Sequence, residues 1–385
     1  MPLLSKRRWL IVPLALGLIF SFITGKAAIA NDPSDLFSLS QPLQVNVNES
    51  FISPLVELFG DVSVGQNVFV SGNTIVRADP ETQICIGNET NLQDNILFLA
   101  VNDAPAPVAP CGDISSSTGE RTSIAHQAVV KNSQIGNFTF IGFHAQLNNV
   151  VLEDGAFVLH GARLENVRIG RDRLVPIGAV ITTQQEADAL PLKAEGNADF
   201  QNEVLEVNEE FAEHYVDLFE SEGFNAVVGV SPAPATSWNP NPVNPTLGDE
   251  IQLDEFVRIV GDVQLGSNST VGQRTSIRAD EGAPIVIGEG AVIEDRVTFH
   301  ALKGTSISIG SNLKTSDNVV FHGPLEVGDR LTIGDDAIVF RSTVGNDVTI
   351  GTKAIIVDVT LADGTIVPPG SIITNQEQAD ALETM

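Results

Sequence analysis

Aliphatic side chains recur at every sixth position in two parts of the chain, and this period constrains the fold more than any other feature. The residues at this spacing include Leu58, Val64, Val70 and Val76 in the first part and Leu265, Val271 and Ile277 in the second. The period fits neither the alternation of a half-buried strand nor the turn of an α-helix. Glycine often follows the aliphatic residue, for example at Gly136 and Gly345. Tandem hexapeptides of this kind predict a parallel β-helix.

Such a β-helix is a triangular prism, and each coil of about eighteen residues supplies one short strand to each of three faces. One aliphatic side chain per face points inward, and Gly, Asn or Asp accept the positive φ at the corners. In hexapeptide proteins the coil is left-handed, an exception to the usual right-handed crossover. The predicted fold class is therefore all-β, with left-handed parallel β-helices.

The chain also contains a large internal duplication. Arg77-Ala78-Asp79 returns as Arg278-Ala279-Asp280, and Ile86-Gly87 returns as Ile287-Gly288. We expect two tandem β-helix domains, at residues 31–230 and 248–385. Residues 231–247 are rich in proline and are predicted to form an extended linker and entry arm.

An apolar stripe near the end of the first domain predicts a helix that closes it. The stripe consists of Val207, Phe211, Tyr215 and Leu218. Asn208 is the expected N-cap, and Gly223 is the expected end. The second domain ends without an equivalent helix, which leaves one end or flank of its prism for a neighbour to cover.

The first thirty residues have the pattern of a secretory signal peptide. Lys6, Arg7 and Arg8 precede an apolar run at residues 9–24, and Ala28-Ile29-Ala30 provides a cleavage site. The alternative is a membrane anchor, but the run is shorter than the roughly 20 residues that a bilayer core requires. We therefore expect cleavage after Ala30 and export to a periplasm, a lumen or the extracellular space. No later segment is apolar enough to span a membrane.

The charge balance argues against some classes of partner. The chain has 49 acidic and 21 basic residues, with a formal net charge of −28. Nucleic-acid affinity depends on Lys and Arg that neutralise phosphates. Neither nucleic acid nor an anionic membrane is therefore an expected partner.

The two cysteines, Cys85 and Cys111, both lie in the first half of the chain. An oxidising compartment would allow them to pair, and the alternative is two unrelated buried thiols. Their spacing does not fit a CxxC metal site.

Both domains contain motifs that the period of six does not explain. The first domain has Arg77-Ala78-Asp79, then Asn91-Leu92-Gln93-Asp94, then His126-Gln127, and later Thr182-Thr183-Gln184-Gln185-Glu186-Ala187-Asp188. The second domain has Arg278-Ala279-Asp280-Glu281-Gly282, His300 and His322. Over nearly all of both halves the chain resembles the γ-class carbonic anhydrases and their carboxysomal relatives. That family binds a metal through three histidines.

The resemblance places three ligand positions in each domain. The positions hold Leu99, His126 and Lys131 in the first domain, and His300, Asp317 and His322 in the second. The second ligand is thus kept only in the first domain, and the other two only in the second. We interpret this reciprocal loss as specialisation of the two copies into complementary halves.

Positions five residues apart lie on neighbouring faces of a prism, so His126 and the Lys131 position cannot face one metal from one β-helix. The resemblance implies a trimer in which each metal lies between two subunits. On this hypothesis His126 from a first domain and His300 and His322 from a second domain form one site. The fourth tetrahedral position would be open for water. Zinc is the expected metal, with iron or cobalt as alternatives.

Other arrangements remain open. The two copies could have decayed independently, or the second domain could trimerise alone with Asp317 as the third ligand. At the opposite interface, Lys131 and Leu99 would face Asp317, and a salt bridge could replace the lost metal. We expect a homo-oligomer built on trimeric rings, either of this chain alone or completed by a paralogue.

The resemblance also implies roles for other residues. Gln93 would orient the nucleophile, Asn91 would accompany it, and Glu281 would accept the proton. Arg77 with Asp79 and Arg278 with Asp280 would form ion pairs at the interfaces. Lys303 occupies the position of a second acidic proton shuttle. The implied reaction is the hydration of carbon dioxide to bicarbonate. The alternatives are an inactive scaffold or assembly subunit and, less favoured, a hexapeptide acyltransferase.

Two further histidines lie near this motif. His144 follows His126 by one coil, and His160 is close to it in sequence. We expect both on the exposed surface of the prism rather than in a second site.

Overall fold

The structure, a computed structural model, describes residues 49–102 and 116–385. The predicted signal peptide and Cys111 lie outside the described residues, so the leader and the pairing of Cys85 with Cys111 stay predictions. In the part of the chain that the structure describes, no helix has both the length and the apolar character needed to cross a bilayer.

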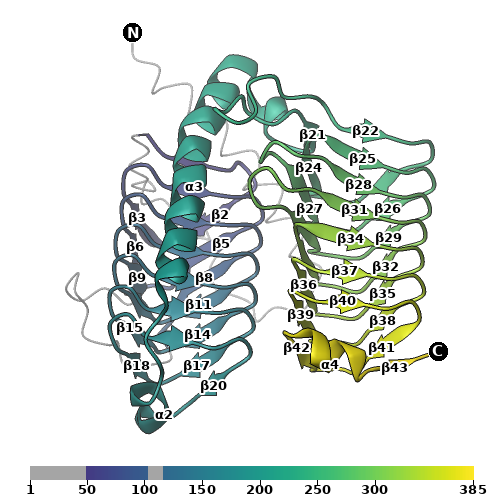
Figure 1. Cartoon of the computed structure of the whole chain (residues 1–385). Helices are drawn as coiled ribbons and strands as arrows, with labels where there is room; N and C mark the ends of the chain where they lie inside the picture. The colour runs from purple at the N-terminus through teal and green to yellow at the C-terminus, as the bar shows by residue number, and fades with distance from the viewer. Residues whose placement is uncertain (1–48, 103–115) are drawn as a thin grey trace, which may run out of the picture. The chain divides into compact units, whose positions relative to one another are not determined.

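The first β-helix has three parallel sheets (Figure 1). Sheet 1A contains β1 (Phe51–Ile52), β4 (Phe69–Val70), β7 (Asn91–Leu92), β10 (Ser123–Ile124), β13 (Phe140–Ile141), β16 (Phe157–Val158) and β19 (Leu174–Val175). Sheet 1B contains β2 (Glu57–Phe59), β5 (Ile75–Ala78), β8 (Leu97–Ala100), β11 (Val129–Lys131), β14 (Gln146–Asn148), β17 (Arg163–Glu165) and β20 (Val180–Ile181). Sheet 1C contains β3 (Asp61–Val64), β6 (Gln83–Ile86), β9 (Ser116–Thr118), β12 (Gln134–Ile135), β15 (Val151–Leu152) and β18 (Arg168–Ile169).

The second β-helix repeats this design. Sheet 2A contains β23 (Gln252–Leu253), β26 (Thr270–Val271), β29 (Val292–Ile293), β32 (Lys314–Thr315), β35 (Thr332–Ile333), β38 (Thr349–Ile350), β41 (Thr365–Val367) and the antiparallel β43 (Glu383–Thr384). Sheet 2B contains β21 (Val230–Ser231), β24 (Arg258–Gly261), β27 (Ser276–Ala279), β30 (Thr298–His300), β33 (Val320–His322), β36 (Ile338–Phe340), β39 (Ile355–Val357) and β42 (Ile372–Ile373). Sheet 2C contains β22 (Thr246–Leu247), β25 (Val263–Leu265), β28 (Ile285–Ile287), β31 (Ile307–Ile309), β34 (Leu325–Val327), β37 (Thr343–Val344) and β40 (Thr360–Leu361).

The predicted all-β fold of two tandem β-helices is confirmed, and the period of six builds its cores. Successive coils place aliphatic residues in register, for example Leu58 beside Val76 and Ile309 beside Val327. Each β-helix has its own core of such buried side chains. Corner residues take positive φ, as at Asn73 and Asn95, because the chain must bend sharply between faces.

The duplication defines which sheets correspond. Arg77 lies in β5 of sheet 1B and Arg278 in β27 of sheet 2B, so these two sheets are equivalent. By the same comparison, sheet 1A is equivalent to sheet 2A. The equivalent surfaces can therefore be compared residue by residue.

Helix α3 (Glu195–Glu222) runs along the first β-helix and lies over sheet 1A (Figure 1). The predicted end at Gly223 agrees with the structure, but the predicted N-cap is wrong. The helix begins thirteen residues before Asn208, at Glu195. Asn208 is buried in its middle and donates its amide to the carbonyl of Val204. The first turns were missed because they are fixed by tertiary contacts, such as the Gln201 amide on the carbonyls of Arg121 and Thr139.

Three short helical segments complete the described chain. They are α2 (Gln184–Asp188), η2 (Phe224–Ala226) and α4 (Gln376–Asp380). Helices α2 and α4 occupy equivalent places after the last coils of the two domains. Between β21 and β22, residues 232–245 form no strand, and we call this proline-rich segment the strap.

The two β-helices pack against each other through sheet 2B. The corner between sheets 1A and 1B contributes Asn73, whose amide binds the carbonyls of Phe256 and Arg274. Further along the same corner, the Gln127 amide binds Thr298 Oγ and two carbonyls of the second β-helix. A shared apolar cluster, which includes Phe140 and Phe157 from sheet 1A and Ile338 and Phe340 from sheet 2B, fills the space between them.

Glycine occupies positions where the two β-helices approach each other closely. Gly161 has φ of 66°, and a Cβ there would lie 2.3 Å from Cδ1 of Ile355. Gly370 has a similar φ of 70°, but a Cβ there would meet nothing within 4 Å. Comparing substitutions at these two glycines therefore distinguishes the effect of backbone strain from the effect of a contact at the interface.

We predict that Gly161→Ala destabilises the protein more than Gly370→Ala. Both substitutions should cost about 1 kcal/mol, because alanine is strained at positive φ. Gly161→Ala should cost about 1 kcal/mol more, because its methyl group displaces Ile355. Urea unfolding followed by circular dichroism measures both, and equal losses would contradict this packing.

Candidate metal centre

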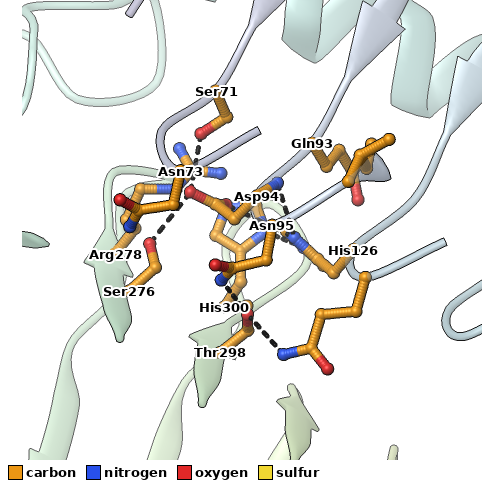
Figure 2. A network of polar contacts seen from close by, with 12 residues as sticks. Ser71, Asn73, Gln93, Asp94, Asn95, His126, Ser276, Arg278, Thr298 and His300 are labelled. Carbon is orange, nitrogen blue, oxygen red and sulfur yellow. Dashed lines mark hydrogen bonds and ion pairs between the residues drawn. The ribbon is translucent and has the colours of Figure 1, made fainter. Parts of the chain in front are cut away.

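Three histidines from the two β-helices converge at this interface (Figure 2 shows two of them). His126 lies in the corner after β10, and His300 and His322 end β30 and β33. One nitrogen of each lies within 4.8 Å of the others, and all three side chains are buried. Among the described residues this is the group that could hold a metal ion.

Strand register explains why His300 and His322 are neighbours. They are paired across adjacent coils of sheet 2B, in an outward column that runs Arg278, His300, His322, Phe340. Coils are spaced by about 4.8 Å, so consecutive side chains of a column are close. The equivalent column of sheet 1B runs Arg77, Leu99, Lys131, Asn148.

The ring geometry directs nitrogen atoms toward one point. His126 Nε2 lies 3.2 Å from His300 Nδ1. The ring centres are 5.1 Å apart for His126 and His300, and 5.4 Å apart for His300 and His322. The latter two rings are perpendicular.

Carboxylates contact the other nitrogens of two of these rings. His126 Nδ1 lies 3.3 Å from Asp94 Oδ2. His300 Nε2 lies 3.2 Å from Asp280 Oδ1 and 3.2 Å from Glu281 Oε1. His322 Nδ1 lies 3.3 Å from the carbonyl oxygen of Gly323. Such partners fix the orientation of the imidazoles.

A buried ionic network surrounds the centre and joins the two β-helices (Figure 2). Arg278 lies between two carboxylates, with its Nε 3.0 Å from Asp94 of the first domain and its Nη1 bonded to Asp280. Asp94 also accepts hydrogen bonds from Ser71 and Ser276. The cost of burying these charges is offset only because each is paired and hydrogen-bonded.

Helix α3 contributes to the same network. The Tyr215 hydroxyl donates to Asp280 Oδ2 at 2.7 Å. Burial, and then the Asp280 charge, raise the pKa of Tyr215, so its hydroxyl stays a donor. Helix α3, which covers the first domain, therefore contacts the second domain at this network.

The burial of these groups sets their charge states. Burial lowers the pKa of His126 to about 4, although the hydrogen bond to Asp94 opposes this shift. Burial also lowers the pKa of His322 well below its ordinary value. Burial opposes ionisation of Asp94, but Arg278 and His126 outweigh it and hold the pKa of Asp94 well below its usual range. Burial raises the pKa of Glu281 to about 7.

Aromatic side chains enclose the centre on the side of later coils. Phe143 stacks on His322 with 4.9 Å between ring centres, and Phe340 contacts the edge of the same ring. His160 stacks on Phe143 at 4.3 Å and accepts a hydrogen bond from its backbone N–H. The expectation that His160 is exposed is wrong, because the second β-helix covers it and leaves it 4% exposed.

Two amides proposed from the sequence lie in sheet 1A and the corner after it. Asn91 donates to Ser123 Oγ, and its Oδ1 is buried without a hydrogen-bond partner. Gln93 Oε1 is likewise buried and without a partner. Figure 2 shows Gln93 in the same region as Asp94, the next residue in the chain.

The remaining sequence candidates lie elsewhere. Arg77 and Asp79 form an ion pair within the first domain, at 2.7 Å, on the outer surface of sheet 1B. Lys131 lies in the same sheet and is half-buried. Asp317 is exposed at a corner of the second domain, and its carboxylate accepts the N–H of Asp295. None of these side chains belongs to the group of three histidines within the described chain.

The sequence interpretation assigned no role to Asp94 or Tyr215. Asp94 stood in the Asn-Leu-Gln-Asp motif and could have been found there, as a carboxylate next to proposed site residues. Tyr215 was assigned only to an apolar stripe, and nothing in that stripe indicated a contact with the other domain.

Comparison with known proteins gives relatives for about half of the chain. No family model matches it. The carboxysome assembly protein CcmM of Nostoc sp. is 38% identical over 175 residues, which cover 45% of this chain and 32% of that protein. The carbonic anhydrase of Methanosarcina thermophila is 34% identical over 184 residues, covering 43% of this chain and 72% of the enzyme. The mitochondrial γ-carbonic anhydrase 1 of Arabidopsis thaliana is 32% identical over 124 residues, which cover 31% of this chain and 43% of that protein.

The chain thus spans about a third of the length of the first of these relatives. Among solved structures, a hexapeptide transferase family protein from Anaplasma phagocytophilum is 19% identical and covers 42% of this chain and 89% of that one, with a TM-score of 0.26. Similarity at this level carries no argument about function.

We predict that Asp94→Asn destabilises the protein by about 3–5 kcal/mol, because Arg278 would stay buried with only one of its two carboxylates. The control is Asp295→Asn at the equivalent position of the second domain, whose Oδ1 accepts the N–H of Gln273. An amide oxygen can keep that bond, so the control should cost about 0.5 kcal/mol or less. Chemical unfolding at pH 7 measures both, and similar losses would show that the network contributes little.

We predict that His160 makes the fold sensitive to acid. Burial, and then the charges of Arg341 and His144, lower its pKa from 6.5 to about 3. As pH falls below 6.5 the unfolded state binds this proton first, so stability is lost between pH 6.5 and 3. Wild type should lose about 2 kcal/mol more than His160→Gln between pH 7 and pH 5. Urea titrations at both pH values give this difference, and parallel pH dependences would refute it.

Proposed function

This chain belongs to the γ-class carbonic anhydrase family, and from that premise we propose that it hydrates carbon dioxide to bicarbonate at a metal centre held by His126, His300 and His322. The observation that carries the proposal is the convergence of these three side chains from two domains that each lack a full set of ligands. The first domain supplies His126, which the second lacks, and the second supplies His300 and His322, which the first lacks.

The donor set fits a divalent metal such as zinc. Three imidazoles with one open position are a ligand set that zinc accepts. Burial keeps His126 and His322 in the neutral form that can donate a lone pair. His126 Nδ1 lies 3.3 Å from the Asp94 carboxylate and 3.2 Å from the Asp94 backbone N–H, and its Nε2 would direct a lone pair toward the side of His300. Iron and cobalt suit the same donors, and metal identity is part of the proposal.

When bound, a metal ion in such a site supplies the acidity that makes water nucleophilic near neutral pH. The protein's own groups would do the rest. Gln93 would orient the nucleophile through its unpartnered Oε1, and Asn91 would hold its end of sheet 1A in place. Glu281, whose Oε1 lies near His300, would accept the proton. Phe143 and Phe340 would present apolar walls to carbon dioxide.

The assembly of the complete centre needs only one chain in this proposal, because its ligands come from the two β-helices of that chain.

We further propose a ring of three β-helices, in which the third position is taken by another subunit, either a copy of this chain or a paralogue. At that interface the Lys131 and Leu99 surface would face Asp317 or its counterpart, without metal. We also propose export after cleavage at Ala30.

A second candidate function is an assembly subunit without catalysis. The observation that favours it is the replacement of ligands at the other copy of the site, where Leu99 and Lys131 continue the column below Arg77. A family protein that had kept only its packing surfaces would lose ligands in this way. The relatives of this chain include a carboxysome assembly protein.

Metal content decides between these functions. We predict about one zinc per chain in the wild type, and loss of it in both His126→Ala and His300→Ala. Affinity should fall by more than the roughly 100-fold that loss of a ligand's hydrogen-bond partner costs. The matched control, His214→Ala on α3, should keep its metal because this histidine pairs with Glu210 and Asp217 and is not one of the three grouped histidines.

The metal measurement is made by elemental analysis after dialysis, followed by a carbon dioxide hydration assay. Loss of metal in His300→Ala but not in His126→Ala would point instead to a site that uses Asp317. A folded wild type without bound metal would refute the enzyme proposal and favour the assembly subunit.

A further inference from the structure

The strap carries one of the two tryptophans of the chain, and it lies against the turn that follows β27. Trp238 donates its indole N–H to the carbonyl of Asp280 at 3.1 Å. Its Cδ1 would be 3.1 Å from a Cβ at Gly282. A side chain at position 282 would press against the indole, and Gly282 also has a positive φ of 88°, which L-residues rarely adopt. Trp238 thus contacts both ends of the three-residue turn 280–282.

This turn carries the two carboxylates that contact His300. The side chains of Asp280 and Glu281 project from it to His300 Nε2, at 3.2 Å each. Glu281 is 8% exposed, although the turn lies at the edge of the second domain. The position of both carboxylates therefore depends on how firmly the turn is held.

Contacts from the first domain and from the second hold Trp238 in place. The Phe211 ring of α3 meets the indole edge at 5.7 Å, and Lys303 Nζ lies 4.4 Å from the indole centre. Next to it, the backbone N–H and hydroxyl of Ser237 donate to the carboxylate of Glu210 at 2.9 and 2.6 Å. Glu210 also belongs to α3, so the strap is fastened to the helix of the first domain.

The loop on the other side of the turn is fixed as well. The carbonyl of Glu281 accepts the N–H of Gly304 at 2.9 Å. Lys303, just before it, is the residue that contacts the indole. The turn is thus clamped between the strap on one side and the 302–305 loop on the other.

We infer that Trp238 is a positioning residue for the metal centre, which holds the carboxylates of Asp280 and Glu281 against His300 and shields that side of the centre from water. The inference rests on the proposed function, because it needs a metal at the three histidines. It assigns the strap a role beyond connecting two domains. Outer partners of a ligand tune both the orientation of the imidazole and the retention of the metal.

The test compares the full chain with Trp238→Ala, Trp238→Phe and Val243→Ala. Phenylalanine keeps an aromatic ring against Phe211 and Lys303 but cannot donate to Asp280. Val243 is an exposed residue of the same strap and serves as the matched control. Each protein is loaded with Zn²⁺, and the rate of transfer to the chromogenic chelator 4-(2-pyridylazo)resorcinol is measured. The visible absorption spectrum of each Co²⁺-loaded protein reports the ligand geometry.

We expect Zn²⁺ to leave Trp238→Ala roughly 10-fold faster than the wild type. The Co²⁺ spectrum of this variant should change, Trp238→Phe should fall between the two, and Val243→Ala should match the wild type. Equal release rates and spectra in Trp238→Ala and the wild type would overturn the inference and leave the proposed function intact. A wild type that binds no Zn²⁺ would overturn the proposed function, and the inference with it.

Discussion

The arrangement of the candidate centre depends on one buried guanidinium. Arg278 stands in sheet 2B, and its two carboxylate partners come from different β-helices. Asp94 and Asp280, held by this cation, in turn contact His126 and His300. If either carboxylate were missing, a charge would remain buried without its partner, which is far more costly than never burying the pair. The same interaction therefore joins the domains and orients two of the three imidazoles.

This dependence explains why the two copies differ so much at equivalent positions. Sheet 2B is buried by the first domain, whereas sheet 1B keeps its surface open within the chain, so Arg278 is 3% exposed and Arg77 lies outside. In the buried column, Arg278 and His300 are held by carboxylates and His322 by the carbonyl of Gly323. On the open column, Leu99 and Lys131 stand where the buried column has His300 and His322. Duplication followed by one-sided packing allows each copy to keep only what its own contacts require.

The sequence predicted the coils well because their physics is local. Aliphatic residues at every sixth position are enough to place Leu58 and Val76 side by side on successive coils, and asparagine marks corners where φ is positive, as at Asn73. The histidine pair of sheet 2B came from the motif resemblance, because His300 and His322 are not separated by a coil of eighteen residues. What the sequence could not predict is registry between surfaces far apart in the chain. The Asp94 contact with Arg278, the burial of His160 and the early start of α3 all depend on that registry. The motif resemblance named the residues of the centre, but periodicity alone would not have joined His126 to the other two.

The covalent link between the β-helices has a consequence for dilution. A centre divided between separate subunits dissociates when the protein is diluted below the affinity of its subunits for one another. Here His126 and His300 are tethered, so their encounter is intramolecular and has an effective concentration set by the linking segment rather than by the amount of protein. The three histidines therefore stay together in a single isolated molecule.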